Sequence, residues 1–254
     1  TMSFMGMDVA MIGYQGTVFP VLIAVWFMSH LEKQLRRVIP DALDIILTPF
    51  LTVVITGFVS LLFIGPAGRG LGHGITYVLT TLYEHAGWLA GLLFGGTYSA
   101  IVITGIHHSF HAIELGLLAD KSVGVNFLLP IWAMANVAQG GACLAVYFKT
   151  KDARIKSIAI PAGVSCLLGI TEAAIFGINL RFVKPFLAAL AGGALGGAWV
   201  VASKVGMTAV GLTGIPGIAI VQSNSVLNYL IGMVIAFGAA FAIATVLRYN
   251  TDAE

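Results

Sequence analysis

A single carboxylate in an otherwise apolar stretch is the strongest candidate for chemistry in this sequence. Glu172 lies in residues 167–186, LLGITEAAIFGINLRFVKPF, where most of the neighbouring side chains would suit lipid. A charged side chain at membrane depth costs about 2.5–3.5 kcal/mol on insertion scales, so such a residue usually has a function. Asn179 and Arg181 follow within about two helical turns. A carboxylate, an amide and a guanidinium together can accept from and donate to the hydroxyls of a sugar. The structural alternative is that Glu172 only pairs with Arg181 or with a backbone amide.

A second group of polar side chains lies in the segment GIHHSFHAIELG and consists of His107, His108, His111 and Glu114. On one α-helix, His107, His111 and Glu114 would share a face. An imidazole can take a hydroxyl proton near neutral pH, so we expect a sugar-handling site in which His108 acts as an acid or base. The alternatives are a satisfied structural network and a metal site. A lone histidine cluster offers few ligands, and we expect neither a metal nor a cofactor.

The composition is that of a membrane protein. Of the 254 residues, 58% are hydrophobic and 9% are charged, fewer charges than a soluble domain of this size carries. A net charge of +2 without a basic stripe argues against nucleic acid as a partner. Cys143 and Cys166 lie in apolar segments without a spacing motif, which indicates neither a disulfide framework nor a metal site.

We therefore predict an all-α membrane protein, a polytopic transmembrane helix bundle with re-entrant hairpins, formed by one domain over 1–254. Its expected parts are a first span at 13–29, a cytoplasmic amphipathic linker helix at 30–41, and a substrate-binding transport core at 45–254. The cations at 33–37 and 149–156 place both segments on the cytoplasmic side. A solvated loop is the alternative for 30–41.

Within the core, long uncharged runs predict membrane spans. They are residues 45–65, 122–148, 185–203 and the end of 205–247. Residues 157–171 are too short to cross and lead into Glu172, which predicts a re-entrant hairpin on the cytoplasmic side. Two overlapping G-x-x-x-G pairs, at 192/196 and 193/197, predict a close-packing helix face. Either one or three crossings must connect positions 66 and 150, so 98–120 is either a broken span or a hairpin.

The stretch GITEAAIFGINLRFVKPF resembles the signature of the sugar-transporting IIC subunits of the bacterial phosphoenolpyruvate-dependent phosphotransferase system, glucose superfamily. Ala173 replaces the proline of the common G-I-T-E-P form, which resembles the sucrose-type branch. The resemblance continues through GIHHSFHAIELGLLAD, NFLLPIWAMANVAQGGACLAVYF and the C-terminal tail. We therefore expect the second half of such a subunit, with further sequence upstream of Thr1.

This resemblance implies a site and its partners. Thr171 and Glu172 match the family's sugar-binding motif, with Glu172 as the activating carboxylate, and His107–His108 match its histidine pair. The full set of expected sugar-binding residues is Gln15, His107, His111, Glu114, Asn136, Gln139, Thr171, Glu172, Asn179 and Arg181, with Glu172 and His108 as the catalytic pair. The implied protein is a multi-pass homodimer in the cytoplasmic (inner) membrane of a bacterium.

Three functions compete at this point. The first is translocation of a disaccharide, sucrose, that is then phosphorylated by the phosphocysteine of a IIB domain, itself supplied by an upstream IIA. The second is a secondary sugar transporter coupled to protons or sodium, which broken helices and a midplane carboxylate suit equally well. The third is a membrane metalloenzyme built on the histidine cluster. Neither cysteine lies in a basic, soluble setting, so the phosphoryl donor is expected outside this chain.

Overall fold

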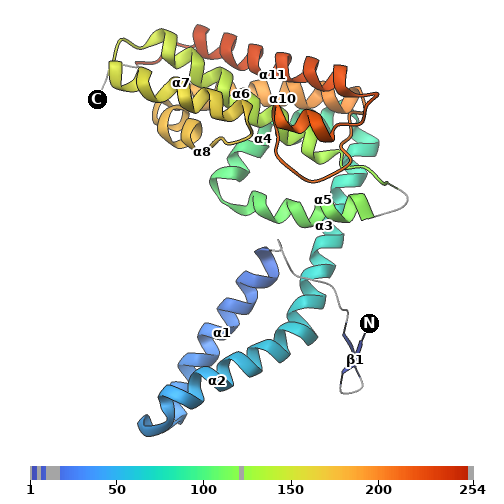
Figure 1. Cartoon of the computed structure of the whole chain (residues 1–254), viewed down its shortest axis with the longest axis vertical. Coiled ribbons are helices and arrows are strands. Elements are labelled where there is room, and N and C mark those ends of the chain that lie inside the picture. Colours follow the sequence, from blue (N-terminus) through green and yellow to red (C-terminus); the bar gives the residue numbers. More distant parts are fainter. Residues whose placement is uncertain (1, 5–6, 10–17, 120–122, 251–254) are drawn as a thin grey trace. The chain divides into compact units, whose positions relative to one another are not determined.

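The computed structural model describes residues 2–4, 7–9, 18–119 and 123–250 (Figure 1). Most of this part is helical, and the predicted all-α membrane class is confirmed. A short antiparallel pairing of β1 (Met2–Phe4) with β2 (Met7–Val9) is an addition that the sequence did not predict. The chain divides into two compact units, the first made of residues 1–77 and 108–113, the second of residues 78–107 and 114–254.

The first unit contains a helical arm in which α1 (Val18–Val38) packs against α2 (Asp41–Val59). Pro40 separates the two helices, because a proline lacks the N–H that would continue α1. A π-helical turn, η1 (Ser60–Ile64), then leads into α3 (Gly65–Ala86). Helix α1 runs without interruption across residues 29 and 30, so the predicted boundary between a first span and a linker helix is not a break in the helix.

Four helices in the described part of the chain are long and apolar enough to cross a membrane. They are residues 41–68, α6 (Leu128–Lys149), α10 (Lys184–Ala202) and α11 (Val226–Val246). These agree with the spans predicted from the uncharged runs. Helix α1 is not among them, since its C-terminal half is polar and charged, and residues 13–17 of the span predicted at 13–29 lie outside the described residues.

The segment around residues 98–120 is sharply bent. Helix α4 (Trp88–Ile103) is followed by a 3-10 turn, η2 (Ile106–Ser109), and by α5 (Phe110–Ala119), with a bend of 116° between the two halves. Tyr83, which precedes α4, stacks on Phe127, which follows α5, with ring centroids 4.0 Å apart. The end of α3 and the start of α6 therefore lie side by side. The bend fits both alternatives left open by the sequence, a broken span and a hairpin.

Glycines bring the helices of the second unit close together. Helix α10 packs against α4, α6 and α11. A Cβ atom on Gly193 would lie 2.7 Å from the carbonyl oxygen of Gly95 in α4, and one on Gly192 would lie 2.6 Å from that of Ala236 in α11. The two overlapping G-x-x-x-G pairs therefore face two different helices, and the predicted close-packing role of these glycines is confirmed.

The predicted re-entrant segment forms a two-armed hairpin against α6. Its first arm is α7 (Ala153–Leu167), and its return arm is formed by α8 (Glu172–Ala174), the π-helical η3 (Ile175–Asn179) and α9 (Leu180–Phe182). The Asp152 carboxylate accepts the Arg154 N–H at 2.7 Å and caps the start of α7. Both arms contribute to a buried cluster with α6, in which Cys166 and Ile178 pack near Cys143.

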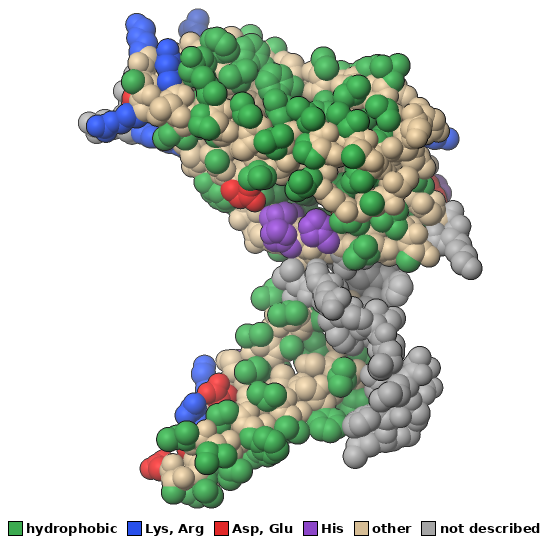
Figure 2. Space-filling model, in the orientation of Figure 1, with side chains coloured by type: hydrophobic (Ala, Val, Ile, Leu, Met, Phe, Trp, Pro, Cys, Tyr) green, Lys and Arg blue, Asp and Glu red, His purple; other side chains and the backbone are tan. Residues whose placement is uncertain are grey.

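Both ends of the hairpin lie at the same end of the second unit. The Lys149 ammonium donates to the carbonyl oxygens of Thr245 and Leu247 at 2.9 and 2.6 Å, and Lys184 donates to that of Arg248. Figure 2 shows Lys and Arg side chains gathered at one end of this unit. The segment 149–156, which the sequence predicts to be cytoplasmic, begins at this end, and the stacked Tyr83 and Phe127 lie at the opposite end of α6.

Candidate functional site

The tip of the hairpin presents Glu172. Gly169 has a φ of +89°, a left-handed conformation that favours glycine, and it turns the chain after α7. The Ile170 N–H donates to the Ser165 carbonyl at 2.9 Å, which closes the turn. Thr171 is buried with 4% exposure, whereas the Glu172 side chain is exposed. The burial expected for this carboxylate is thus not observed, because Glu172 begins the return arm at the surface of the unit.

A second loop, residues 211–217, holds this tip from the other side. The Ile215 N–H donates to the Leu167 carbonyl at 2.7 Å. A Cβ atom on Gly169 would lie 2.8 Å from the Thr213 hydroxyl oxygen, so the two loops cross at close range. Gly214 has a φ of +68°, and a Cβ there would overlap the Leu167 carbonyl oxygen. The Thr171–Glu172 turn therefore depends on two glycines whose missing side chains permit the crossing.

Two helices fix the second loop in turn. The Asn136 amide in α6 donates to the Thr213 hydroxyl at 2.8 Å, and the Tyr229 hydroxyl in α11 donates to the Gly214 carbonyl at 2.8 Å. Sequence reasoning missed Thr213, Gly214 and Tyr229. The glycine-rich GLTGIPG run marked a loop, but only the fold shows that this loop lies against the tip.

Gln139 and Asn179 bind each other. Both side chains are fully buried, and the Asn179 amide donates to the Gln139 side-chain oxygen at 2.7 Å and to its backbone carbonyl at 3.0 Å. This pair ties α6 to the π-helical turn of the return arm. The sequence predicts both as sugar ligands, and in the structure they also hold the hairpin to α6.

Arg181 does not neutralise Glu172. Its side chain is exposed, and its guanidinium lies 5.7 Å from the Phe182 ring. Within the described residues, Glu172 has neither a hydrogen bond nor an ion pair. The structural alternative, a Glu172–Arg181 pair, is therefore not formed, and the carboxylate keeps its capacity to accept from a ligand.

The histidine segment is not one continuous α-helix. Residues 106–109 form the 3-10 turn η2 and α5 begins at Phe110, so the single face predicted for His107, His111 and Glu114 is interrupted. His107, in the second unit, lies edge-on to Tyr98 with ring centroids 6.4 Å apart. In the first unit, the rings of His108 and His111 are 6.0 Å apart. The Glu114 side chain is buried with 1% exposure.

The remaining expectations concern metals, thiols and Gln15. No cluster of three His, Cys, Asp or Glu side chains able to hold a metal is found in the described ranges. Cys143 and Cys166 are fully buried, and the Cys143 thiol donates to the Ala159 carbonyl at 3.4 Å. Gln15 lies outside the residues that the structure describes.

Comparison with known proteins matches residues 1–193 to the family described as Phosphotransferase system, EIIC. The chain is 76% identical over 254 residues to the PTS system sucrose-specific EIIBC component of Salmonella typhimurium, covering 100% of this chain and 56% of the relative. The sucrose-specific EIIBC component of Bacillus subtilis is 59% identical over 256 residues, covering 100% and 55%. The trehalose-specific EIIBC component of the same organism is 39% identical over 237 residues, covering 93% and 50%.

No solved structure matches the chain. The chain spans about half the length of the curated relatives it matches, 56% of the Salmonella protein and 55% of the Bacillus one. The family match covers well over half of the chain and includes the Thr171–Glu172 hairpin. This protein belongs to the EIIC family of the phosphotransferase system.

Proposed function

We propose that this chain forms the sugar-translocating part of a sucrose phosphotransferase in the bacterial inner membrane. The observation that carries the proposal is the identity of 76% and 59%, over the whole chain, to sucrose-specific EIIBC components of two organisms. The trehalose-specific relative is more distant, at 39%. Sucrose is therefore the substrate that we assign.

The exposed tip of the hairpin supports a sugar site at Glu172. A carboxylate without a protein partner in the described residues can accept hydrogen bonds from two sugar hydroxyls. The turn that presents it is fixed by the crossing loop and by Asn136 and Tyr229, so the carboxylate is preorganised. Thr171 lies beside it as a second hydrogen-bonding group.

The chemistry assigned to this site is phosphoryl transfer to a bound sugar. The sulfur–phosphorus bond of a phosphocysteine breaks, a phosphorus–oxygen bond to a sugar hydroxyl forms, and the hydroxyl proton passes to a base. Glu172 and His108 are the candidates for that base, because a positioned carboxylate or imidazole can take a proton in the transition state. The buried Cys143 and Cys166 are unsuited to carry the phosphoryl group, so the donor is a separate IIB domain supplied by a IIA.

Two further sets of proposals complete this function. The other proposed sugar contacts are Gln15, His107, His111, Glu114, Asn136, Gln139, Asn179 and Arg181. We also propose that the protein works as a homodimer. Crosslinking of the protein in native membranes tests the dimer, since a monomer would yield no crosslinked pair at any reagent concentration.

The test of the sugar site is the affinity of the purified full-length protein for sucrose after Glu172→Gln. A hydrogen bond to a charged group contributes about 1.5–3 kcal/mol, so we expect affinity to fall about 10- to 150-fold. Glu32→Gln, the same change in the arm helix α1, is the matched control and should leave affinity unchanged. Unchanged affinity with lost phosphorylation would assign Glu172 to catalysis alone. Unchanged affinity with unchanged phosphorylation would reject the site.

The energy source separates this proposal from a secondary transporter. Sucrose uptake by proteoliposomes should require a phosphorylated IIB domain and should yield sucrose phosphate inside. Accumulation of free sucrose driven by a proton or sodium gradient, without phosphorylated IIB, would favour the secondary transporter instead.

A further inference from the structure

A pocket of about 150 Å³ lies at the end of the second unit opposite the cation-rich end, and the hairpin site does not use it. Three segments that are far apart in the sequence form its floor. Asn126 and Met207 exchange two backbone hydrogen bonds of 2.9 Å, and the Gln222 N–H donates to the Gly206 carbonyl at 3.0 Å. These bonds pin residues 125–127, 205–207 and 221–222 together, so the floor is preorganised.

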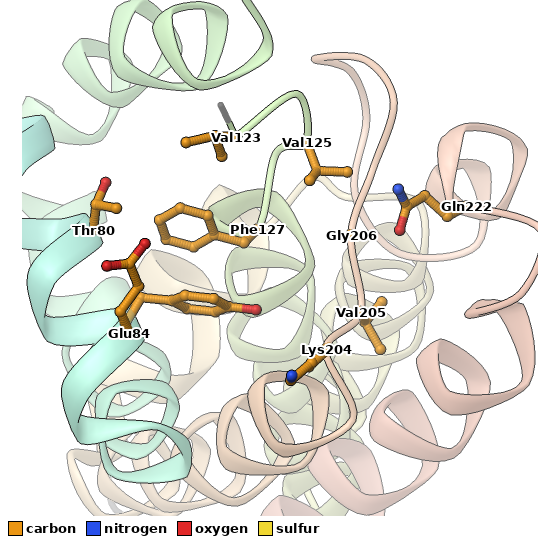
Figure 3. Close-up of a pocket in the computed structure, with 10 residues that line it drawn as sticks. Thr80, Glu84, Val123, Val125, Phe127, Lys204, Val205, Gly206 and Gln222 are labelled. Carbon is orange, nitrogen blue, oxygen red and sulfur yellow. The ribbon is translucent and has the colours of Figure 1, made fainter. Parts of the chain in front are cut away.

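An aromatic wall and polar side chains converge on this floor (Figure 3). The wall is the stacked pair of Tyr83 and Phe127. Glu84 on α3 lies on one side of the Phe127 ring and the Gln222 amide on the other, with Lys204 between the lining segments. Partial burial raises the pKa of the Tyr83 phenol, which therefore stays a neutral hydrogen-bonding group at physiological pH.

Gly206 makes room for a polar group of the pocket. Lys204, with a φ of +51°, follows the C-terminus of α10, where the Val205 N–H donates to the Val200 carbonyl at 2.9 Å, a common helix-ending conformation. A Cβ atom on Gly206 would lie 3.0 Å from both the Gln222 side-chain oxygen and Val125. The glycine thus leaves the room that the Gln222 amide occupies.

The polar groups of the pocket are available to a ligand. Within the described residues, the side chains of Glu84, Lys204 and Gln222 have neither a hydrogen bond nor an ion pair. One carboxylate and one ammonium balance each other, which disfavours a charged ligand. A carboxylate, an amide and an ammonium beside an aromatic wall suit a neutral molecule with many hydroxyls.

We propose that this pocket is a second saccharide site, at the outer end of the bundle, that takes one ring of the sugar before it reaches the hairpin. Its volume is below the about 300–1,000 Å³ of pockets that enclose drug-sized ligands, so the second ring of a disaccharide stays in solvent. The inference rests on the proposed function for the identity of the sugar and on the cation distribution for the side of the membrane.

The experiment is protection of an introduced thiol in intact cells. Val125→Cys places a cysteine in the pocket lining, and the two native cysteines are fully buried, so background labelling is low. A membrane-impermeant maleimide added from outside should label the new thiol. Sucrose should slow labelling about tenfold at ten times its dissociation constant, because the rate follows the unoccupied fraction. Sorbitol at equal osmolarity should not.

Two added changes assign the protection to the pocket. Gln222→Leu on the Val125→Cys background should weaken protection about three- to tenfold by removing a neutral hydrogen-bonding group. Gln34→Leu, the same change in α1, should leave protection intact. Glu172→Ala on the same background should also leave it intact, since the site at the hairpin is a different one.

Three results would overturn the inference. They are a Val125→Cys thiol that the outside reagent cannot reach, labelling that sucrose never slows, and protection that is lost with Glu172→Ala but kept with Gln222→Leu. Val123→Cys, also in the lining, repeats the test if the first variant does not reach the membrane. Failure of the proposed function shows separately, as a wild-type protein that neither binds nor phosphorylates sucrose.

Discussion

Helix α6 and the span at 41–68 differ in the opposite sense in hydropathy and in burial. In the span at 41–68, 17% of the residues of the apolar stretch are buried, against 94% in α6, although α6 is the less hydrophobic of the two. In a soluble protein the more hydrophobic helix would be the more buried one. Here the more hydrophobic helix is the less buried one.

The difference follows from lipid acting as the solvent. Lipid tails are as apolar as leucine, so burying a leucine side chain between helices gains little free energy. Buried helix faces are therefore enriched in small residues and in side chains that form hydrogen bonds between helices. Helix α6 has Gly140 and Gly141 at close contacts and Asn136 and Gln139 in hydrogen bonds. The exposed face of the 41–68 span instead carries large apolar side chains, such as Ile45 with 85% exposure.

The largest expected effect is steric and comes from Gly141→Val. A Cβ atom on Gly141 would overlap the backbone carbonyl oxygen of Phe237 in α11, which cannot rotate away. We expect a loss of about 3 kcal/mol or more, at the upper end of overpacking effects, visible as a lower midpoint of thermal unfolding in detergent. Gly57→Val in α2 is the matched control, since nothing lies within 4 Å of its added Cβ. Equal losses in both variants would refute the contrast between the two helices.

This contrast also explains how much of the fold the sequence predicts. Uncharged runs indicate α6, α10 and α11 because lipid exposure imposes hydropathy on long segments, and the small-residue spacing of α10 indicates its close contacts. It is harder to predict where a helix is continuous, because α1 passes from apolar to charged residues without a break that composition could mark. The 3-10 turn at residues 106–109 interrupts the single helix that the periodicity of the histidines predicts there.

The same distinction between local sequence and long-range packing applies to the candidate site. Local sequence places Glu172 after a glycine turn, and the short apolar run before it predicts the hairpin. The bond between Asn179 and Gln139, 40 residues apart, and the crossing of Gly169 by Thr213 depend on long-range packing. The sequence shows that each of these residues is polar or flexible, but it does not show which residue each of them contacts.

The second-largest expected effect concerns buried polar side chains, compared between the helices of the second unit and the arm. Asn179→Leu leaves the buried Gln139 side-chain oxygen without its donor, which should destabilise the protein by about 1–3 kcal/mol. Thr52→Val in α2 removes a buried hydroxyl that has no partner in the described residues, so it should be neutral or slightly stabilising. Both are measured as shifts in the thermal unfolding midpoint. A larger loss for Thr52→Val than for Asn179→Leu would show that the arm depends on its hydroxyls more than the bundle does on its amides.

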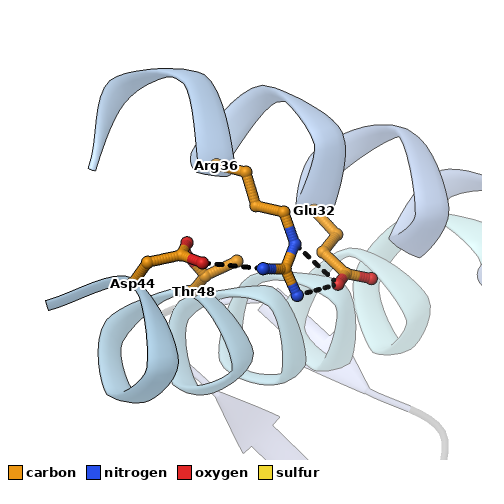
Figure 4. A network of polar contacts seen from close by, with 4 residues as sticks. All are labelled: Glu32, Arg36, Asp44 and Thr48. Atoms are coloured by element: carbon orange, nitrogen blue, oxygen red, sulfur yellow. Dashed lines mark hydrogen bonds and ion pairs between the residues drawn. The ribbon is translucent and has the colours of Figure 1, made fainter. Parts of the chain in front are cut away.

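The arm has one polar network of its own, at the surface between α1 and α2 (Figure 4). The Arg36 guanidinium donates to the Glu32 carboxylate at 2.8 and 3.1 Å and to the Asp44 carboxylate at 2.7 Å. The Thr48 hydroxyl donates to the other oxygen of Asp44 at 2.6 Å. The hydrogen bond to Glu32 and the charge of Asp44 raise the pKa of Arg36, which is charged at any physiological pH in either case.

The smallest expected effect is therefore that of Arg36→Gln. Exposed ion pairs gain little because water screens them, and the Arg36 side chain is 51% exposed. We expect a slightly lower unfolding midpoint at low salt, and a difference from wild type that vanishes as salt approaches 1 M, where the screening length falls to about 3 Å. Arg37→Gln is the matched control, because Arg37 is next to Arg36 on the same helix and forms no ion pair in the described residues. An Arg36→Gln effect that exceeds that of Gly141→Val, or that persists unchanged at high salt, would mean that charge and not packing holds the arm together.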